Sequence, residues 1–387
     1  MPSTNVAVVG IAVTKFGELW SKSLRNLLAE SQFAALEDAK LSPKEVDMIV
    51  TGNMLAGELS GQTHLGAMAS ELLNLNIPSY RVEGACASGS LALSAGINAI
   101  KAGAANIVLI NGAEKMTDIA TNQINSALMS ASNEETEGFQ GATFCALYAM
   151  MARAYMHEYS LTRKQLAMVS VKNHKHGSLN PTAQFRNEIT VDQVLESTLV
   201  ADPLTLLDCS PISDGAASVI LASEEVARKI TDTPIWILGS SIATDSIALH
   251  DRKSLLEMPA TAIAAQKAYQ QAKISPEQIN ITEIHDCFTI AEIIAMEGLN
   301  LVEKGAAGKT VEEGMTYYDG KIPINPCGGL KACGHPIGAT GIKQVVEVAK
   351  QLRGEAGRRQ VANPMYGLTH NVGGTGATVA VNIFKRN

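Results

Sequence analysis

The chain has 387 residues, of which 46% are apolar, 18% charged and 4% aromatic, a globular composition with room for more than one domain. Its net charge of −7 argues against a nucleic-acid-binding protein. Its six cysteines form no CxxC pair and no Cys/His cluster of the zinc type, so we expect neither a disulfide framework nor a metal site.

The first predicted element is a strand over residues 5–13 (NVAVVGIAV), with no basic segment of a signal peptide before it. The longest apolar region, residues 91–110, contains Ser94, Asn98 and Lys101 and is too polar to cross a membrane. We therefore expect a soluble, cytoplasmic protein.

Helices and strands then alternate through the first half of the chain. The predicted elements are a helix over 27–39, a strand over 47–52, a helix just after Cys86 and a strand over 106–113. Residues 119–205 have a helical, polar pattern without clear strands, and we interpret them as an insertion over the active site. Residues 209–223 predict a return strand of the first half.

The insertion is basic. From Met151 to Thr190 it carries six Lys/Arg against two Glu, a difference of four positive charges, together with His157, His174 and His176. In an acidic chain such a stretch either attracts a phosphorylated ligand or forms a solvated basic face.

The second half repeats the alternation, with strands predicted over 234–242, 281–286, 366–374 and 376–384 and helices between them. The segment AKLSPKEVD from Ala39 matches AKISPEQIN from Ala272 in identical or similar residues, at an offset of 233 positions. In both copies Ser-Pro is typical of a helix start, with Ser as N-cap and Pro at the first helical position. The chain therefore consists of two related halves.

This order of elements predicts the fold class. Alternating strands and helices imply mainly parallel sheets with helices on both faces. Two such halves stacked together give an α/β fold of five layers, αβαβα, with an inserted loop domain. We expect residues 1–118 with 206–232 to form the N-terminal half, 119–205 the insertion and 233–387 the C-terminal half.

Four stretches place reactive side chains among small residues, at a strand end or a helix start. Cys86 lies in RVEGACASGSLALSAG (81–96), and the others are IHDCFT (284–289), KACGHPIGATG (331–341) and THNVGGTG (369–376). Ligands of open α/β sheets gather at the carboxyl ends of strands. The two related halves predict that His285 and His335 approach the Cys86 thiol.

The stretches GACASGS, HDCF, CGGLKACGHPIGATG and HNVGGTG resemble, in order, the active-site blocks of the thiolase family. GAEKM, VKNHKHGSLNP and CSPISDGAA resemble it too, so the resemblance covers nearly the whole chain. HDCF is typical of sterol-carrier-type and archaeal acetoacetyl-CoA thiolases. The resemblance implies an acetyl-CoA C-acetyltransferase of lipid metabolism, which condenses two acetyl-CoA through an acyl-cysteine or cleaves a 3-oxoacyl-CoA by thiolysis.

The chemistry assigns a role to each of these blocks. A thiol with an ordinary pKa of about 8.5 must lose its proton to attack a thioester. We assign Cys86 as the nucleophile, activated by the helix that follows it, and His335 as its base. His285 and His335 offer N–H groups to an enolate oxygen. Backbone N–H groups of Cys86 and Gly373 form a second oxyanion hole, with Asn371 beside it.

The base for the α-proton is open among three thiols. Many thiolases use a cysteine in the C-terminal block, where this chain has Asn371. The resemblance to the HDCF subgroup implies Cys287 instead. Cys333 is the alternative acid/base and Cys327 the third candidate.

Five other residues near these blocks have simpler expected roles. We interpret Cys145 and Cys209 as structural thiols and Asp286 as a buried hydrogen-bond partner. His174 and His176, in the basic insertion, either contact the phosphates of CoA or face water.

Three alternatives to a thiolase stay open. A ketosynthase-like enzyme needs Cys86, His285 and His335 but no second thiol, so Cys287 discriminates the two. An acyltransferase with a non-CoA acceptor fits the same scaffold. A non-catalytic acyl-CoA-binding partner is compatible with Asn371. The resemblance further implies a homodimer or homotetramer, a possible small OB-fold partner protein, CoA thioesters as substrates and no cofactor or metal.

Overall fold

The computed structural model describes residues 5–387. Nine strands form one sheet in the order β3-β2-β4-β7-β1-β8-β11-β10-β9. The first five are β3 (Ser79–Val82), β2 (Met48–Gly52), β4 (Ile107–Glu114), β7 (Gly215–Ser223) and β1 (Val6–Val13); the others are β8 (Ile235–Thr244), β11 (Thr378–Arg386), β10 (Tyr366–Gly373) and β9 (Ile281–Glu283). The two sets meet only at one end of β1, where Val6 to Val8 pair with β8.

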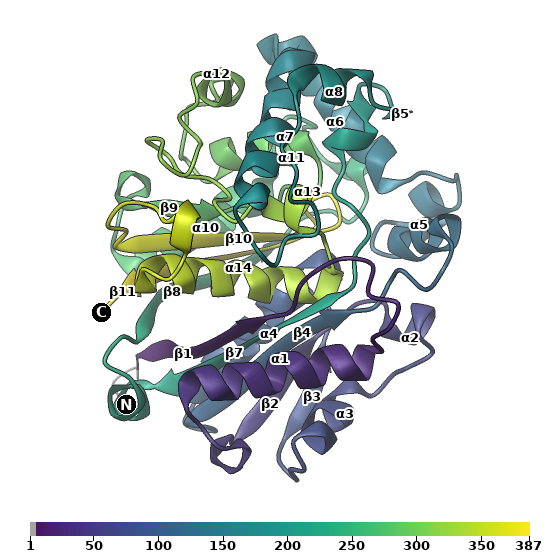
Figure 1. Cartoon of the computed structure of the whole chain (residues 1–387). Coiled ribbons are helices and arrows are strands. Elements are labelled where there is room, and N and C mark those ends of the chain that lie inside the picture. Colours follow the sequence, from purple (N-terminus) through teal and green to yellow (C-terminus); the bar gives the residue numbers. More distant parts are fainter. Residues whose placement is uncertain (1–4) are drawn as a thin grey trace.

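Helices separate the two sets of strands and cover their outer faces, as Figure 1 shows. Two central helices, α4 (Ser88–Lys101) and α14 (Ile337–Arg353), pack against each other; α14 contacts β4 and β7 on one side and β10 on the other. The outer helices are α1 (Leu24–Ala39), on β1 and β7, and α10 (Pro259–Ala272), on β8 and β11. The expected five layers, αβαβα, are confirmed.

Side chains alternate between the two faces of a strand. Both faces of the first set of strands therefore carry apolar side chains that helices cover. Val8 and Val108 face the central helices, whereas the neighbouring Val9 and Leu109 pack toward α1. Because both faces are apolar, β4 is buried along its whole length.

The strand directions differ from the expectation of mainly parallel sheets. Only β2–β3, β2–β4 and β9–β10 pair in parallel, and the other neighbours pair antiparallel. The reason is connectivity: β7 returns after the long insertion instead of after a crossover helix. A tight turn joins β10 to β11, and such a turn makes an antiparallel pair.

The internal repeat is confirmed at the level of the backbone. Lys40 and Lys273 end their helices in the left-handed region, with φ of 56° and 55°. Ser42 and Ser275 then form capping boxes at two short 3-10 helices, which lead into β2 and β9. Matching sequences thus form matching connections in the two halves.

The insertion is helical, as expected. It contains α5 (Thr121–Met129), α6 (Phe144–Tyr159), α7 (Arg163–Ser178) and α8 (Val191–Glu196), followed by a hairpin of β5 (Leu199–Ala201) and β6 (Leu204–Thr205). The remaining helices are α2 (Ala56–Leu59), α3 (Leu65–Leu72), α9 (Glu224–Ile230), α11 (Thr289–Gly298), α12 (Ala307–Glu312) and α13 (Gly329–Cys333). Within residues 5–387, no helix has both the length and the apolarity needed to cross a membrane. The domain boundaries stay a prediction.

Contact between the halves predicts the effect of one substitution. A Cβ added at Gly112 of β4 would overlap the carbonyl oxygen of Gly338 and lie 3.0 Å from Ala339 Cα in α14. We expect Gly112→Ala to lower the free energy of unfolding by about 1–3 kcal/mol, because backbone must move to admit the methyl group. Urea denaturation measures the change. Gly57→Ala is the matched control, since its Cβ would meet only the Thr63 methyl group, at 3.3 Å. Equal stabilities of the two variants would contradict the prediction.

Candidate active site

A cavity of about 340 Å³ lies where the starts of the two central helices face the segments that follow β9 and β10. Its polar lining includes Cys86, His285, Cys287 and His335. Apolar side chains make up much of the rest, among them Met116, Leu128, Phe144, Ile212, Phe288 and Ile337. The structure therefore brings residues from both halves and from the insertion into one cavity.

Cys86 sits in a strained turn ahead of α4. Ala85 has φ of +51°, a left-handed conformation that is unfavourable for a residue with a Cβ. Ser88 stabilises the turn, because its hydroxyl donates to the Ala85 carbonyl at 2.6 Å and accepts from the Gly84 N–H at 3.0 Å. The turn aims the thiol into the cavity.

The thiol and the two histidines converge. The Cys86 sulfur and one ring nitrogen each of His285 and His335 all lie within 4.8 Å of one another and are buried. The two rings meet edge to face, with centroids 5.0 Å apart. Within residues 5–387, neither Nε2 atom has a hydrogen-bond partner. Both are thus available to a substrate.

Asn371 sets the tautomer of His285. Its Nδ2 donates to the Cys86 carbonyl at 2.9 Å and lies 3.1 Å from His285 Nδ1. Because a carbonyl only accepts, the NH₂ group must face this side, and His285 Nδ1 is then an acceptor. The ring proton of His285 therefore resides on Nε2 and points into the cavity as a donor.

We assign the opposite tautomer to His335 from its contact with Thr340. The Thr340 hydroxyl donates to the Pro336 carbonyl at 3.0 Å, and its oxygen lies 2.7 Å from His335 Nδ1. That oxygen then accepts from Nδ1–H, so His335 Nε2 presents a lone pair. One histidine offers a donor and the other an acceptor. This pairing fits proton transfer and anion stabilisation better than metal binding, because a protonated Nε2 cannot ligate a cation.

Burial keeps these groups neutral in the resting site. It raises the pKa of Cys86 to about 12, which the backbone N–H of Gly374 partly opposes. Burial also lowers the pKa of His335 to about 3 and, together with His335, the pKa of His285 well below its usual value. The start of α4 therefore does not ionise Cys86 by itself, so the thiol needs a base to take its proton.

The structure separates the three candidates for the second thiol. Cys287 lines the cavity, and burial raises its pKa, an effect that the neighbouring Tyr148 hydroxyl partly offsets. Cys333 instead donates to the Cys327 carbonyl at 3.0 Å, and Cys327 is held by Lys343. Neither Cys327 nor Cys333 lines the cavity. Of these three candidates, only Cys287 lines the cavity of Cys86.

Asp286 is a buried hydrogen-bond partner, as expected. Its carboxylate accepts from the N–H groups of Leu330 and Lys331 at 2.7 and 3.2 Å and from Asn173 Nδ2 at 2.8 Å. These bonds tie the segment of His285 and Cys287 to the start of α13.

One expectation about binding residues needs correction. His174 and His176 do not face CoA phosphates or water: both are buried, and their Nδ1 atoms bond to the carbonyls of Asn187 and Asn325. Burial lowers their pKa to about 4 and about 3, so neither carries a charge for an anion. Gly373, expected in the second oxyanion hole, precedes Gly374, which lies on the cavity wall and whose backbone N–H lowers the pKa of Cys86. The role of Gly373 stays a prediction.

Sequence reasoning missed Thr340 and Tyr148. Thr340 follows Pro336 by four residues in a helix start, and threonine at that spacing commonly bonds the carbonyl one turn back, which was an available signal. Tyr148 lies in the insertion, where no pattern placed it beside Cys287.

Comparisons with known proteins decide the family. The family model for the thiolase N-terminal domain matches residues 6–225, and the one for the thiolase C-terminal domain-like region matches residues 241–386. The chain belongs to the thiolase family.

Curated relatives match this thiolase over nearly its whole length. The acetyl-CoA acetyltransferase of Methanothermobacter thermautotrophicus is 53% identical over 383 residues, which cover 99% of this chain and 100% of the relative. The acetyl-CoA acetyltransferase of Methanocaldococcus jannaschii is 48% identical over 389 residues, 98% of this chain and 99% of the relative. Sterol carrier protein 2 of Bos taurus is 36% identical and covers 98% of this chain and 72% of its own.

Solved structures confirm the thiolase fold. The Ltp2-ChsH2(DUF35) aldolase has a TM-score of 0.85 at 24% identity, covering 98% of this chain and 97% of that chain. Human mitochondrial 3-ketoacyl-CoA thiolase in complex with CoA has a TM-score of 0.77 at 18% identity, covering 99% of this chain and 98% of that chain.

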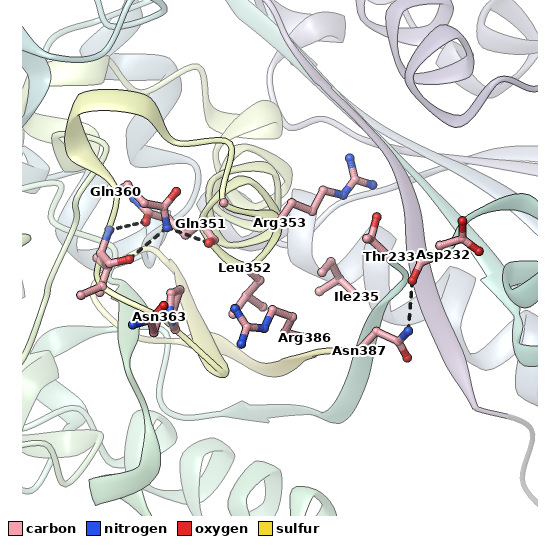
Figure 2. Close-up of a pocket in the computed structure, with 14 residues that line it drawn as sticks. Asp232, Thr233, Ile235, Gln351, Leu352, Arg353, Gln360, Asn363, Arg386 and Asn387 are labelled. Atoms are coloured by element: carbon pink, nitrogen blue, oxygen red, sulfur yellow. Dashed lines mark hydrogen bonds between the residues drawn. The ribbon is translucent and has the colours of Figure 1, made fainter.

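A larger cavity of this thiolase, about 550 Å³, lies far from Cys86 between the end of α14 and the C-terminus (Figure 2). Several of its polar groups bond within its own wall: Asn387 Nδ2 donates to the Asp232 carbonyl at 3.1 Å and Gln360 Nε2 to the Gln351 carbonyl at 2.9 Å. Its lining contains no cysteine and no histidine. Acyl transfer therefore belongs to the smaller cavity.

The neutral resting state of this thiolase predicts a pH dependence. Because the raised pKa of Cys86, about 12, lies above the accessible range, its thiolate fraction grows throughout that range. We expect alkylation of Cys86 by iodoacetamide to rise about tenfold per pH unit between pH 7 and 9. Mass spectrometry of the Cys86 peptide measures the rate. A plateau below pH 8 would indicate a preformed thiolate–imidazolium pair instead.

Proposed function

We propose that this thiolase is an acetyl-CoA C-acetyltransferase, which condenses two acetyl-CoA to acetoacetyl-CoA and CoA and also runs the reverse thiolysis. The main observation in support is that one cavity contains the Cys86 and Cys287 thiols together with His335, a hydrogen-bond acceptor, and His285, a donor. Supporting it, relatives up to 53% identical are named acetyl-CoA acetyltransferase. The acyl-CoA thioesters are substrates, and the proposal needs no resident cofactor.

In the first half-reaction the Cys86 sulfur attacks the thioester carbonyl while His335 Nε2 takes the thiol proton. Backbone N–H groups at Cys86 and Gly374 stabilise the oxyanion of the tetrahedral intermediate. The carbon–sulfur bond to CoA then breaks, and Cys287 protonates the departing CoA thiolate. The products are acetyl-Cys86, free CoA, a Cys287 thiolate and a His335 imidazolium.

In the second half-reaction the Cys287 thiolate removes a proton from the α-carbon of the second acetyl-CoA. His285 and His335 now both present Nε2–H groups, and each donates to the enolate oxygen. The enolate carbon attacks the carbonyl carbon of the acetyl group on Cys86. The carbon–sulfur bond to Cys86 then breaks and acetoacetyl-CoA is released. The Cys86 thiolate recovers its proton from His335, so every group returns to its starting state.

Two observations bear on the alternatives. A decarboxylating ketosynthase-like enzyme has no use for a thiol beside Cys86, whereas Cys287 lies there. Asn371 is the residue that made a non-catalytic acyl-CoA-binding partner conceivable. Its side-chain amide contacts the Cys86 carbonyl and His285 Nδ1 and so helps to position both residues. On the family resemblance we also propose a homodimer or homotetramer. The OB-fold partner and the cytoplasmic location stay predictions.

Acetyl transfer tests the roles of the two cavity thiols. After incubation with acetyl-CoA we expect intact-mass spectrometry to show an acetyl adduct on the wild type and none on Cys86→Ala. Cys287→Ala should form the adduct and condense about 10²–10⁴-fold more slowly, because it lacks the acid–base group. Cys333→Ala is the matched control, since its sulfur lies outside the cavity. No adduct on the wild type would exclude acetyl-CoA as donor, and normal condensation by Cys287→Ala would revive the ketosynthase-like alternative.

The tautomer of His335 makes a separate prediction. Thr340→Val keeps the shape of the side chain but removes the acceptor of His335 Nδ1–H, so the ring loses its fixed orientation. We expect kcat/KM for acetoacetyl-CoA thiolysis to fall about a hundredfold. Thr340→Ser, which keeps the hydroxyl, should stay close to wild type. Equal losses in both variants would contradict the role of the hydroxyl.

A further inference from the structure

A second pair of thiols lies on the wall of the same cavity. Cys145 and Cys209 both line it, and their sulfur atoms are 3.6 Å apart, within hydrogen-bond distance. Both residues are partly exposed, unlike Cys327 and Cys333, which are buried. The sequence led us to interpret this pair as structural, and the proposed mechanism gives it no task.

The two thiols are chemically unequal. Cys145 occupies the second position of α6, a helix of 16 residues, where the helix dipole favours a thiolate. The contact between the two sulfurs lowers the pKa of Cys145 and raises that of Cys209, and the Cys209 thiol also donates to the Thr205 carbonyl at 3.4 Å. Its position at the start of α6 makes Cys145 the better nucleophile of the two. An accessible attacking thiol with a resolving thiol at its side is the arrangement of redox-active dithiols.

We propose that Cys145 and Cys209 form a reversible disulfide site on the active-site wall, which low-molecular-weight disulfides oxidise and which blocks acyl transfer when closed. The Cys145 thiolate attacks one sulfur of the small disulfide, forms a mixed disulfide and releases a thiolate. Cys209 then attacks the Cys145 sulfur and releases the second small thiol. Both protein protons end on the two released thiols, so the small disulfide is reduced by two electrons and the protein is oxidised by two.

Formation of the Cys145–Cys209 disulfide would displace Cys287 through the backbone. The sulfurs must approach from 3.6 Å to about 2.05 Å, which draws the Cys209 segment toward α6. That segment is joined to the HDCF block by backbone contacts. Cys209 forms an isolated antiparallel β-bridge with Phe288, and the Ser210 N–H donates to the Cys287 carbonyl at 2.9 Å. A shift of Cys287 by a fraction of an ångström to one ångström is enough to slow proton transfer severely.

Disulfide mapping tests the site independently of the proposed function. Cys86→Ala, which lacks the proposed nucleophile, is incubated with glutathione disulfide, unfolded, alkylated with iodoacetamide and digested. We expect one cross-linked peptide pair, Cys145–Cys209, which dithiothreitol removes. Cys145→Ser and Cys209→Ser in the same background should each lose it. Absence of the cross-link, or a cross-link of Cys287 in its place, overturns the proposal.

An activity measurement tests the consequence and rests on the proposed function. Wild-type enzyme is oxidised in the presence of acetyl-CoA, which keeps Cys86 as its acetyl thioester, and is then assayed. We expect activity to fall at least tenfold and to return with dithiothreitol, while Cys145→Ser and Cys209→Ser keep the activity that each has when reduced. A cross-linked wild type with full activity would overturn the blocking effect. No activity in the reduced enzyme would instead count against the proposed function and leave the mapped cross-link standing.

Discussion

The site depends on one packing constraint: the two central helices approach each other backbone to backbone near their starts. A Cβ at Gly89 of α4 would lie 2.8 Å from the Gly338 carbonyl oxygen, and a Cβ at Gly341 of α14 would lie 2.6 Å from the Ser90 nitrogen. Only glycine permits this approach. As a result the two helix starts meet, one preceded by Cys86 and the other by His335. The acyl-transfer pair is thus a product of backbone contact between the halves.

Asn371 is the polar counterpart of that contact. One amide group on β10 satisfies the Cys86 carbonyl and sets the tautomer of His285. A cysteine has a single proton to donate and cannot do both. An amide at this position therefore holds the site together but cannot serve as a base, and the second thiol stands on the HDCF block, at Cys287. In the proposed cycle, Cys287 therefore takes the role of base that a cysteine at position 371 has in many thiolases.

The apolar lining explains why charge enters this site only during the reaction. Burial disfavours the charged forms of Cys86, His285 and His335 alike. In the proposed cycle His335 begins as an acceptor and becomes a donor once it holds the Cys86 proton, so one ring serves both half-reactions. The same cavity wall carries Cys145 and Cys209, and any change in their bonding acts on the chemistry at close range.

Much of this protein followed from the sequence. Motif order indicated the family, the match of Ala39 to Ala272 indicated two halves, and the alternation of strands and helices indicated sheets covered by helices on both faces. These features are local, because a helix cap or a strand pattern depends on residues near one another in the chain. Strand direction was less accessible, since the antiparallel return of β7 depends on the path of a long insertion.

The sequence by itself determined the residue types of the site, and only the tertiary structure decided which of them meet. The sequence left the base open among Cys287, Cys333 and Cys327, yet the fold places Cys287 in the cavity of Cys86, buries Cys333 elsewhere and sets Cys145 beside Cys209. The buried positions of His174 and His176 were equally hidden in a stretch that is basic overall. The physical reason is distance along the chain: the protonation of His285 depends on an amide 86 positions away, and no local pattern records that contact.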